Sequence, residues 1–405
     1  MSRVAITGIG ILAPGSIGAE GFRTMLRSGD TAIAPIDRFY TTGLTSHRAA
    51  LVRGFQARDF IAPMKLRRMN TLSRYAMAAA KMALDDSGLE VSRRQEAGVA
   101  IGTMFGPVQT SVEYMREYVE KGASLAPPQL FAESVANAPG SHMAIEFGLR
   151  GFNLTFTQRE SSALAAATFA ASQIVKGSLE AALIGGVEEI NEMVFSVLAR
   201  LGALAHQTAE VDEASRPFDR RRNGIVLGEG SAVLVAESTE SAVARGARAH
   251  AYLSGFGIGR DTSASISDWG TGSEKIARVM RAAIDDAGVE AGEIDAVWAS
   301  ANSSRRGDAV EAQALRALFG SNMPPVAATK GYFGEYAGGG AIHLAAAVMA
   351  VADQELPLSR GCDVPEPSSM PVTADRMQMP IRHMLVNSVS SGGGVICAVL
   401  SRERA

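Results

Sequence analysis

The chain has 405 residues, of which 47% are hydrophobic and 20% are charged, a composition typical of a globular protein with ample material for a core. The formal net charge of −3 gives no indication of a nucleic-acid partner. No segment approaches the ~18 apolar residues of a membrane span, so no membrane partner is expected. Only two cysteines occur, Cys362 and Cys397, which excludes a disulfide framework and favours a cytoplasmic location.

Strand and helix signals alternate along the chain. Short β-branched or apolar runs predict strands at 4–12, 97–102, 153–156 and 180–187. Helical spacing predicts helices over 73–89, 132–147 and the small-residue run 161–177, with Gly88 capping the first. Such alternation indicates parallel strands that are covered by helices on both faces.

Two segments of the first half recur in the second half. ALDDSGLEVSRRQEAGVAIGT, from Ala83, resembles AIDDAGVEAGEIDAVWASANS, from Ala283, and both predict a helix, a glycine cap, a charged connection and a strand. The helical runs 163–177 and 342–356 form a second pair. Repeats separated by half the chain length predict a duplicated α/β body rather than a solenoid.

Residues 155–163, TFTQRESSA, lead directly into the run of small residues. A strand, a sharp turn and a buried helix in this order suit a nucleophile, because the amides and dipole at a helix N-terminus stabilise an anion. The position expected for the nucleophile holds Glu160.

Several motifs resemble those of the β-ketoacyl-(acyl carrier protein) synthase family. RPFDRRRNGIVLGEGSAVLVAE at 216–237 resembles its RPFD and GEG motif, and VAITGIGILAP, KLRRMNTLSRYAMAAAKMAL, IGGVEE and NSVSSGGGV match in the same order. The resemblance covers essentially the whole chain. It implies the thiolase fold, in which two duplicated βαβαβαβαββ halves form a five-layered αβαβα body, here expected as 1–248 and 249–405.

Condensing enzymes of this family carry a Cys and two His, and the resemblance implies where these residues would lie. The Cys motif corresponds to TQRESSA, with Glu160 in place of the Cys. The first His motif corresponds to WASANSSRRGD, with Ser300 in place of the His. The second corresponds to KGYFGEYAGGG, which has Glu335 in place of the His but retains Lys330. All three groups that would carry the acyl chain and assist decarboxylation of a malonyl unit are therefore replaced.

This loss is similar to that in the chain length factor branch, the non-catalytic partners of active ketosynthases in type II polyketide systems. The resemblance implies a heterodimer with an active ketosynthase, which sets the length of a polyketide or polyene chain on the phosphopantetheine of an acyl carrier protein. Gln is commoner than Glu at this branch's Cys position. Two alternatives stay open: an acyl hydrolase or acyltransferase that uses Glu160 and Glu335 or Ser161, and a homodimeric scaffold that binds acyl chains.

Two interpretations of Glu160 follow from its position at a helix N-terminus. The carboxylate could accept hydrogen bonds from the free amides there, filling the former thiol pocket, with a cation such as Arg159 as its partner. The replacement could equally be drift after the chemistry was lost. No Cys or His cluster has metal-ligand spacing, and GIGIL near residue 8 lacks the dinucleotide-binding pattern, so no metal or cofactor is expected.

Candidate contacts to partners come from two kinds of side chain. In the family, the stretch 102–122 crosses the dimer interface, and Thr110, Tyr114 and Met115 would share one helical side there as tunnel-lining residues, with ordinary core packing as the alternative. Carrier proteins are acidic, so the basic residues Lys65, Arg67 and Arg68 and the triplet 220–222 are candidate docking contacts. Such charge runs are also typical of solvated surfaces.

Overall fold

The computed structural model describes residues 4–403, whose main feature is one mixed sheet. Its strand order is β6-β5-β7-β8-β1-β9-β15-β14-β10-β11, and β2 pairs with β1. The strands of this sheet are β1 (Val4–Ala13), β2 (Ser16–Ile17), β5 (Gly98–Gly102), β6 (Asn153–Phe156), β7 (Ala181–Glu188), β8 (Gly230–Ser238), β9 (Ala251–Arg260), β10 (Ala296–Trp298), β11 (Val326–Ala327), β14 (His383–Val389) and β15 (Gly394–Ser401). Two small hairpins lie outside it: β3 (Ile33–Pro35) with β4 (Arg48–Ala50), and β12 (Glu355–Leu356) with β13 (Met377–Gln378).

The strand order confirms the duplication. From each edge inward, the first three strands pair in parallel, the fourth is antiparallel to the third, and the fifth is antiparallel to the fourth. The two halves meet where β1 pairs with β9 along Val4–Ile6 and Ala251–Leu253. The alternating pattern by itself predicts parallel strands, and β8 and β15 depart from it because each returns antiparallel to the strand before it, as the closing ββ pair of each βαβαβαβαββ half implies. The boundary at 248/249 falls between α10 and β9 and stays a prediction.

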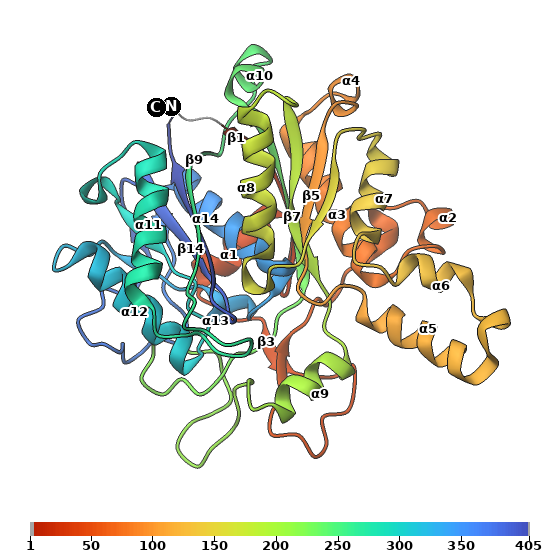
Figure 1. Ribbon diagram of the computed structural model, residues 1–405, viewed down its shortest axis with the longest axis horizontal. Helices are drawn as coiled ribbons and strands as arrows, with labels where there is room; N and C mark the ends of the chain where they lie inside the picture. Colours follow the sequence, from red (N-terminus) through yellow and green to blue (C-terminus); the bar gives the residue numbers. More distant parts are fainter. Residues whose placement is uncertain (1–3, 404–405) are drawn as a thin grey trace.

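Helices lie on the outer faces and between the two halves of the sheet (Figure 1). On the outside, α3 packs against β1 and β8, and α11 packs against β9 and β15. In the middle, α8 packs against β5 and β7, and α14 contacts strands of both halves. This arrangement is the five-layered thiolase-like fold. The helices are α1 (Ala19–Ser28), α2 (Pro63–Leu66), α3 (Thr71–Ser87), α4 (Val91–Arg94), α5 (Val108–Lys121), α6 (Pro128–Glu133), α7 (Ala138–Phe147), α8 (Ser162–Val175), α9 (Glu192–Arg200), α10 (Thr239–Ala244), α11 (Ser273–Ala287), α12 (Arg305–Phe319), α13 (Lys330–Phe333) and α14 (Ala341–Asp353).

The repeated segments form equivalent structures in the two halves. The outer helix α3 ends at Gly88 and leads to β5, and α11 ends at Gly288 and leads to β10, with both glycines in the left-handed conformation that caps a helix. The helix predicted over 132–147 is wrong in extent, because α6 ends at Glu133 and α7 begins at Ala138. Pro139 lies in the first turn of α7, a position that proline tolerates because no helical N–H is needed there.

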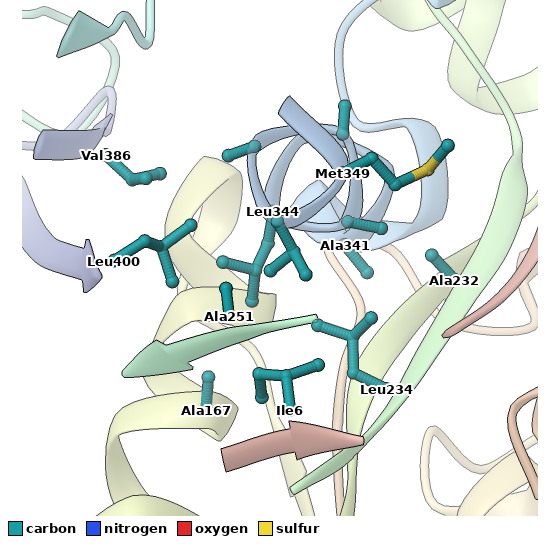
Figure 2. Close-up of a cluster of buried hydrophobic side chains, with 14 of the residues drawn as sticks. Ile6, Ala167, Ala232, Leu234, Ala251, Ala341, Leu344, Met349, Val386 and Leu400 are labelled. Carbon is teal, nitrogen blue, oxygen red and sulfur yellow. The ribbon is translucent and has the colours of Figure 1, made fainter. Parts of the chain in front are cut away.

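The middle layer is built from small side chains. Every residue of α14 from Ala341 to Val351 is buried, and Figure 2 shows this helix between side chains such as Val386 and Leu400 on one side and Ala232 and Leu234 on the other. Alanines along α8 and α14 allow the helices to approach both halves of the sheet closely. Among residues 4–403, no helix combines the length and apolar character that crossing a bilayer requires.

Candidate functional site

A tight turn separates the edge strand β6 from the buried helix α8, as the sequence predicts. The chain passes through a 3₁₀ turn, Arg159–Ser161, before α8 begins at Ser162. Arg159 has a φ of 53°, in the left-handed region that non-glycine residues rarely adopt. The turn therefore directs the side chain of Glu160 into the protein, where it is only 3% exposed.

The carboxylate of Glu160 is bound by neutral donors from other parts of the chain. Its Oε1 accepts hydrogen bonds from the Tyr336 hydroxyl at 3.0 Å and the Ser391 hydroxyl at 2.9 Å. Its Oε2 accepts from the backbone N–H of Ser391 at 3.2 Å. The expected pairing with Arg159 is not found, because Arg159 Nη1 donates to the Ser391 hydroxyl at 2.9 Å instead. No amide of α8 donates to the Glu160 side chain among the hydrogen bonds of the described chain, so the pocket is filled from the 388–391 side rather than by the helix.

A second buried carboxylate, Glu335, lies next to this group. Its Oε2 accepts hydrogen bonds from Lys330 Nζ at 2.7 Å and Asn302 Nδ2 at 2.6 Å. Its Oε1 accepts from the backbone N–H of Tyr336 at 2.8 Å. The retained Lys330 thus forms a buried ion pair with the residue that replaces the second His. Tyr336 connects both carboxylates, since its hydroxyl binds Glu160 and its amide binds Glu335.

Unusual backbone conformations hold these groups together. Tyr336 has a φ of 65°, and it is followed by the turn Ala337–Gly340, whose three glycines also have positive φ angles. A Cβ atom on Gly339 would lie 2.5 Å from the Gly102 carbonyl oxygen, and one on Gly340 would lie 2.8 Å from that of Glu160. Only glycine permits this approach, so the Gly-rich segment brings Tyr336 against the turn that carries Glu160.

The first His position, Ser300, belongs to a separate set of hydrogen bonds. Its hydroxyl and the backbone of Val389 bond to each other, and its own amide donates to Glu311 Oε1 at 2.8 Å. Asn387 Nδ2 donates to the same carboxylate oxygen at 3.0 Å. His343 is buried nearby and its Nε2 contacts the Asn387 carbonyl oxygen at 3.1 Å. Ser300 therefore has a packing and hydrogen-bonding role in this structure.

Burial sets the protonation of the site. Desolvation, followed by the negative charge of Glu335, raises the pKa of Glu160 to about 7. Desolvation likewise raises the pKa of Glu311 to about 7 and lowers the pKa of His343 to about 3, so this imidazole stays neutral. The pKa of Tyr336 is raised well above its ordinary value by burial and by Glu160. Burial thus favours the neutral forms of these groups, in contrast to the ion pair of Lys330 and Glu335 beside them.

The remaining candidate nucleophiles lack an activating group. Ser161 Oγ bonds only to the Ser388 carbonyl at 3.1 Å and the Ser390 hydroxyl at 2.6 Å among the described hydrogen bonds, so no base contacts it. Burial raises the pKa of the Cys362 thiol to about 12 and raises that of Cys397 further. Both thiols therefore stay protonated, and a protonated thiol is a weak nucleophile.

Sequence reasoning missed five residues that bind or support this network: Asn302, Asp308, Glu311, Tyr336 and Ser391. Asp308 accepts the backbone N–H groups of Phe218, Asn302 and Ser303, and so shapes the loop before α12. A signal existed, because these residues lie in or directly beside the motifs that carry Ser300 and Glu335 or in NSVSSGGGV. The motif comparison considered only the positions of the missing Cys and His, so it did not include these neighbouring residues.

The candidate tunnel residues lie on α5, which projects from the body together with α6 (Figure 1). Thr110 is buried, Tyr114 is half-buried with its ring 5.6 Å from that of Phe131, and Met115 is 52% exposed. The three residues therefore range from the base of α5 to its surface. Packing of Tyr114 on Phe131 joins α5 to α6.

The basic candidates differ from one another in their surroundings. Arg67 and Arg68 are exposed, and Lys65 is exposed but forms an ion pair with Glu146. The triplet 220–222 is not the surface patch that the sequence suggests. Arg222 is only 5% exposed and binds Glu366, and Arg221 pairs with Asp219 and Asp363. Residues 4–403 contain no cluster of three or more His, Cys, Asp or Glu side chains that could hold a metal ion.

Comparison with known proteins agrees with this fold and these motifs. The model of the β-ketoacyl synthase N-terminal domain matches residues 1–242, and that of the C-terminal domain matches residues 250–363. The chain belongs to the β-ketoacyl synthase family. It is 31% identical over 404 residues to a 3-oxoacyl-[acyl-carrier-protein] synthase 2 of Vibrio cholerae, with 96% of this chain and 97% of the relative covered.

Relatives from polyketide biosynthesis match at similar sequence identity. The tetracenomycin polyketide synthase ketoacyl synthase beta subunit of Streptomyces glaucescens is 32% identical over 381 residues, which cover 90% of this chain and 89% of the relative. The solved structure of the ishigamide ketosynthase/chain length factor superposes with a TM-score of 0.91 at 29% identity and 100% coverage of both chains. The relatives of this β-ketoacyl synthase family member therefore include both 3-oxoacyl-[acyl-carrier-protein] synthases and subunits of polyketide synthases.

Proposed function

We propose that this chain is a chain length factor, a non-catalytic subunit that pairs with an active ketosynthase and sets the length of a chain carried by an acyl carrier protein. The observation that carries the proposal is the state of the three replaced positions. Glu160, Ser300 and Glu335 are each at most 4% exposed and each is held by hydrogen bonds from within the protein. A site occupied by its own side chains is suited to a scaffold rather than to condensation.

Exposed apolar side chains support a protein partner. Several of them lie on α5, α6 and the edge strand β6, and β6 pairs only with β5 within the described sheet. An unpaired strand edge beside exposed apolar side chains is typical of an interface. The residues concerned are Met115 (52% exposed), Tyr118 (43%), Val119 (76%), Phe131 (57%) and Leu154 (40%).

The alternative of altered chemistry rests on one observation, the pKa of Glu160 near neutrality. A carboxyl group that titrates near the working pH suits general acid–base catalysis. Against this alternative, the second carboxylate, Glu335, is held by Lys330, and Ser161 has no base. The non-catalytic role therefore explains more of the geometry.

Reconstitution tests the proposal directly. The chain is co-expressed with a ketosynthase that has its Cys and both His, and the purified pair is given carrier protein and malonyl units. We expect a one-to-one complex and a chain whose mass is not reproduced by either protein alone. A stable homodimer that ignores the ketosynthase would contradict the proposal. Acyl-carrier hydrolysis by the chain alone, lost in Glu160→Gln, would favour the alternative.

The same assay tests the candidate tunnel residues. We expect Thr110→Ala, Tyr114→Ala or Met115→Ala to lengthen the product, because a smaller side chain leaves more room at the interface. Val243→Ala on α10, which lies away from α5 (Figure 1), is the control for an exposed apolar substitution. Unchanged product mass in all three variants would remove these residues from the tunnel.

Docking of the carrier protein is tested at Arg67 and Arg68, which are exposed. If they bind an acidic carrier protein, Arg67→Glu and Arg68→Glu slow transfer at low salt by reversing the local charge. Lys65→Ala should have less effect, because Glu146 already neutralises this ammonium group. Equal rates for all three variants would assign docking to the partner subunit.

A further inference from the structure

A large cavity lies apart from the site of Glu160, Ser300 and Glu335. It has a volume of about 790 Å³ and lies between the β3–β4 hairpin, the loop 207–216 and the loop 358–363. Neither Glu160 nor Ser300 nor Glu335 lines it. A volume of this size is typical of sites for small molecules, which occupy roughly 300–1,000 Å³.

Three arginines line this cavity without a carboxylate partner. Arg48, Arg216 and Arg360 form no ion pair with any Asp or Glu of residues 4–403. Other arginines do form ion pairs, for example Arg221 with Asp219 and Arg222 with Glu366. Arg48 Nη2 donates to the Ile33 carbonyl oxygen and Arg216 Nη1 to that of Asp212, so each retains further N–H donors. Three guanidinium groups without a carboxylate at ion-pair distance keep N–H donors available to an anion in this cavity.

Three carboxylates also lie on the cavity wall, and the charges of Asp212 and Asp363 act on Arg216 without forming an ion pair with it. Glu213 is buried and its oxygens accept the backbone N–H groups of His47 and Arg48. Asp363 forms an ion pair with Arg221, which lies outside the lining, and Asp212 accepts from the Gln207 side chain. The carboxylates thus bond to groups other than the three cavity arginines, whose remaining N–H donors stay open to a ligand.

The cavity also offers polar atoms and room for an organic group. Ser215, 4% exposed, lines it and has no hydrogen-bond partner for its hydroxyl among the described residues. Gly361 has a φ of 90°, and a Cβ there would lie 2.3 Å from the Ser215 carbonyl oxygen, so glycine is required where these two loops meet. Ile33, Pro35 and Leu358 add apolar surface to the same cavity.

We infer that this cavity binds an organic phosphate, with Arg48, Arg216 and Arg360 holding the phosphate oxygens. Guanidinium groups bind phosphate through paired N–H donors, and several of them match an anion that carries more than one negative charge. The apolar wall suits the organic part of the molecule. This site is independent of the proposed chain length role, because it uses none of the residues on which that role depends.

Calorimetric titration of the full-length protein tests the inference, with inorganic pyrophosphate and ADP as probes. We expect saturable binding at one site, and a dissociation constant at least about tenfold higher in Arg216→Gln and in Arg360→Gln, since each loses a charge-assisted contact. Arg220→Gln, an exposed arginine outside the cavity, is the matched control and should bind like the wild type. Tighter binding of ADP than of pyrophosphate would show that the apolar wall contacts the organic group.

If Arg216→Gln does not fold, the Arg360→Gln variant still tests the inference. Arg360 is exposed, and substitution of an exposed side chain should leave the structure intact. Thermal unfolding of each variant checks this point. The inference would be overturned if neither pyrophosphate nor ADP bound to the wild-type protein at millimolar concentration. Binding that is equal in the wild type and Arg360→Gln would overturn it as well.

Discussion

Two buried carboxylates, Glu229 and Glu160, are held in opposite ways. Glu229 is fully buried, and its two oxygens accept both Nη groups of Arg38 at 2.8 Å and the backbone N–H groups of Val52 and Ile190. Glu160 is almost as buried, but within the described chain its hydrogen bonds come only from hydroxyl and amide donors, and no cation bonds to it directly. One carboxylate is therefore a charged cross-link between segments, and the other is close to a neutral hydrogen-bonding group.

The two carboxylates differ in how the protein compensates for their burial. A carboxylate with a bidentate guanidinium partner has its charge compensated where it is buried. At Glu160 the structure instead tolerates a carboxyl group by raising its pKa toward 7. Four tests, from the largest expected effect to the smallest, examine this difference.

The largest effect is expected at the Glu229 cross-link. Arg38→Ala should lower the free energy of unfolding by about 3–5 kcal/mol, because it leaves a buried carboxylate without its cation. Urea denaturation measures the change. Arg53→Ala is the matched control: its pair with Asp37 is exposed on both sides, so its loss should cost less than about 1 kcal/mol. Equal costs for both substitutions would end the distinction between the two kinds of pair.

An intermediate effect is expected from removing the side chain of Glu160. Glu160→Ala should destabilise the protein by about 1–3 kcal/mol, because Tyr336 and Ser391 lose their shared acceptor inside the protein. Glu160→Gln keeps an acceptor and should cost less than about 1 kcal/mol at neutral pH. If Gln were as destabilising as Ala, the carboxyl group would be ionised and essential, as at Glu229.

These contrasts also show what the sequence could predict. Hydrophobic periodicity predicted the strands and helices, and the repeated segments predicted the duplicated body. These signals are present in the sequence because each half must bury similar apolar faces. The antiparallel return of β8 and β15 does not follow from the hydrophobic pattern, which carries no information on strand direction, and only the family resemblance implied it through the closing ββ pair of each half. The partners of Glu160 were missed for a related reason: Tyr336 and Ser391 are 176 and 231 residues away along the chain. Likewise, Arg221 is neutralised by Asp363, which the triplet itself cannot reveal.

A smaller effect concerns pH. The folded pKa of Glu160 lies near 7 and its ordinary value is 4.5, so between these values the native state binds more protons than the unfolded state. Stability therefore falls as pH rises through this window and levels off above it. Glu188 and Glu189, whose pKa values burial raises to about 8 and about 7, act in the same direction. The urea midpoint should thus fall less between pH 5 and 8 in Glu160→Gln than in the wild type. Parallel pH profiles would contradict the raised pKa.

The smallest expected effect is none, in Glu160→Cys without a partner subunit. A thiol at this turn would lie at the start of α8, where the helix N-terminus favours a thiolate. Decarboxylation and the developing negative charge would still lack both imidazoles, because Ser300 bonds to Val389 and Glu335 is held by Lys330 and Asn302. Carrier-protein assays with malonyl units should therefore detect no condensation, while mass spectrometry could still detect an acyl group on the new thiol. Measurable condensation by this single variant would show that the remaining groups are catalytically competent. Glu160 alone would then account for the expected lack of condensation activity in the wild type.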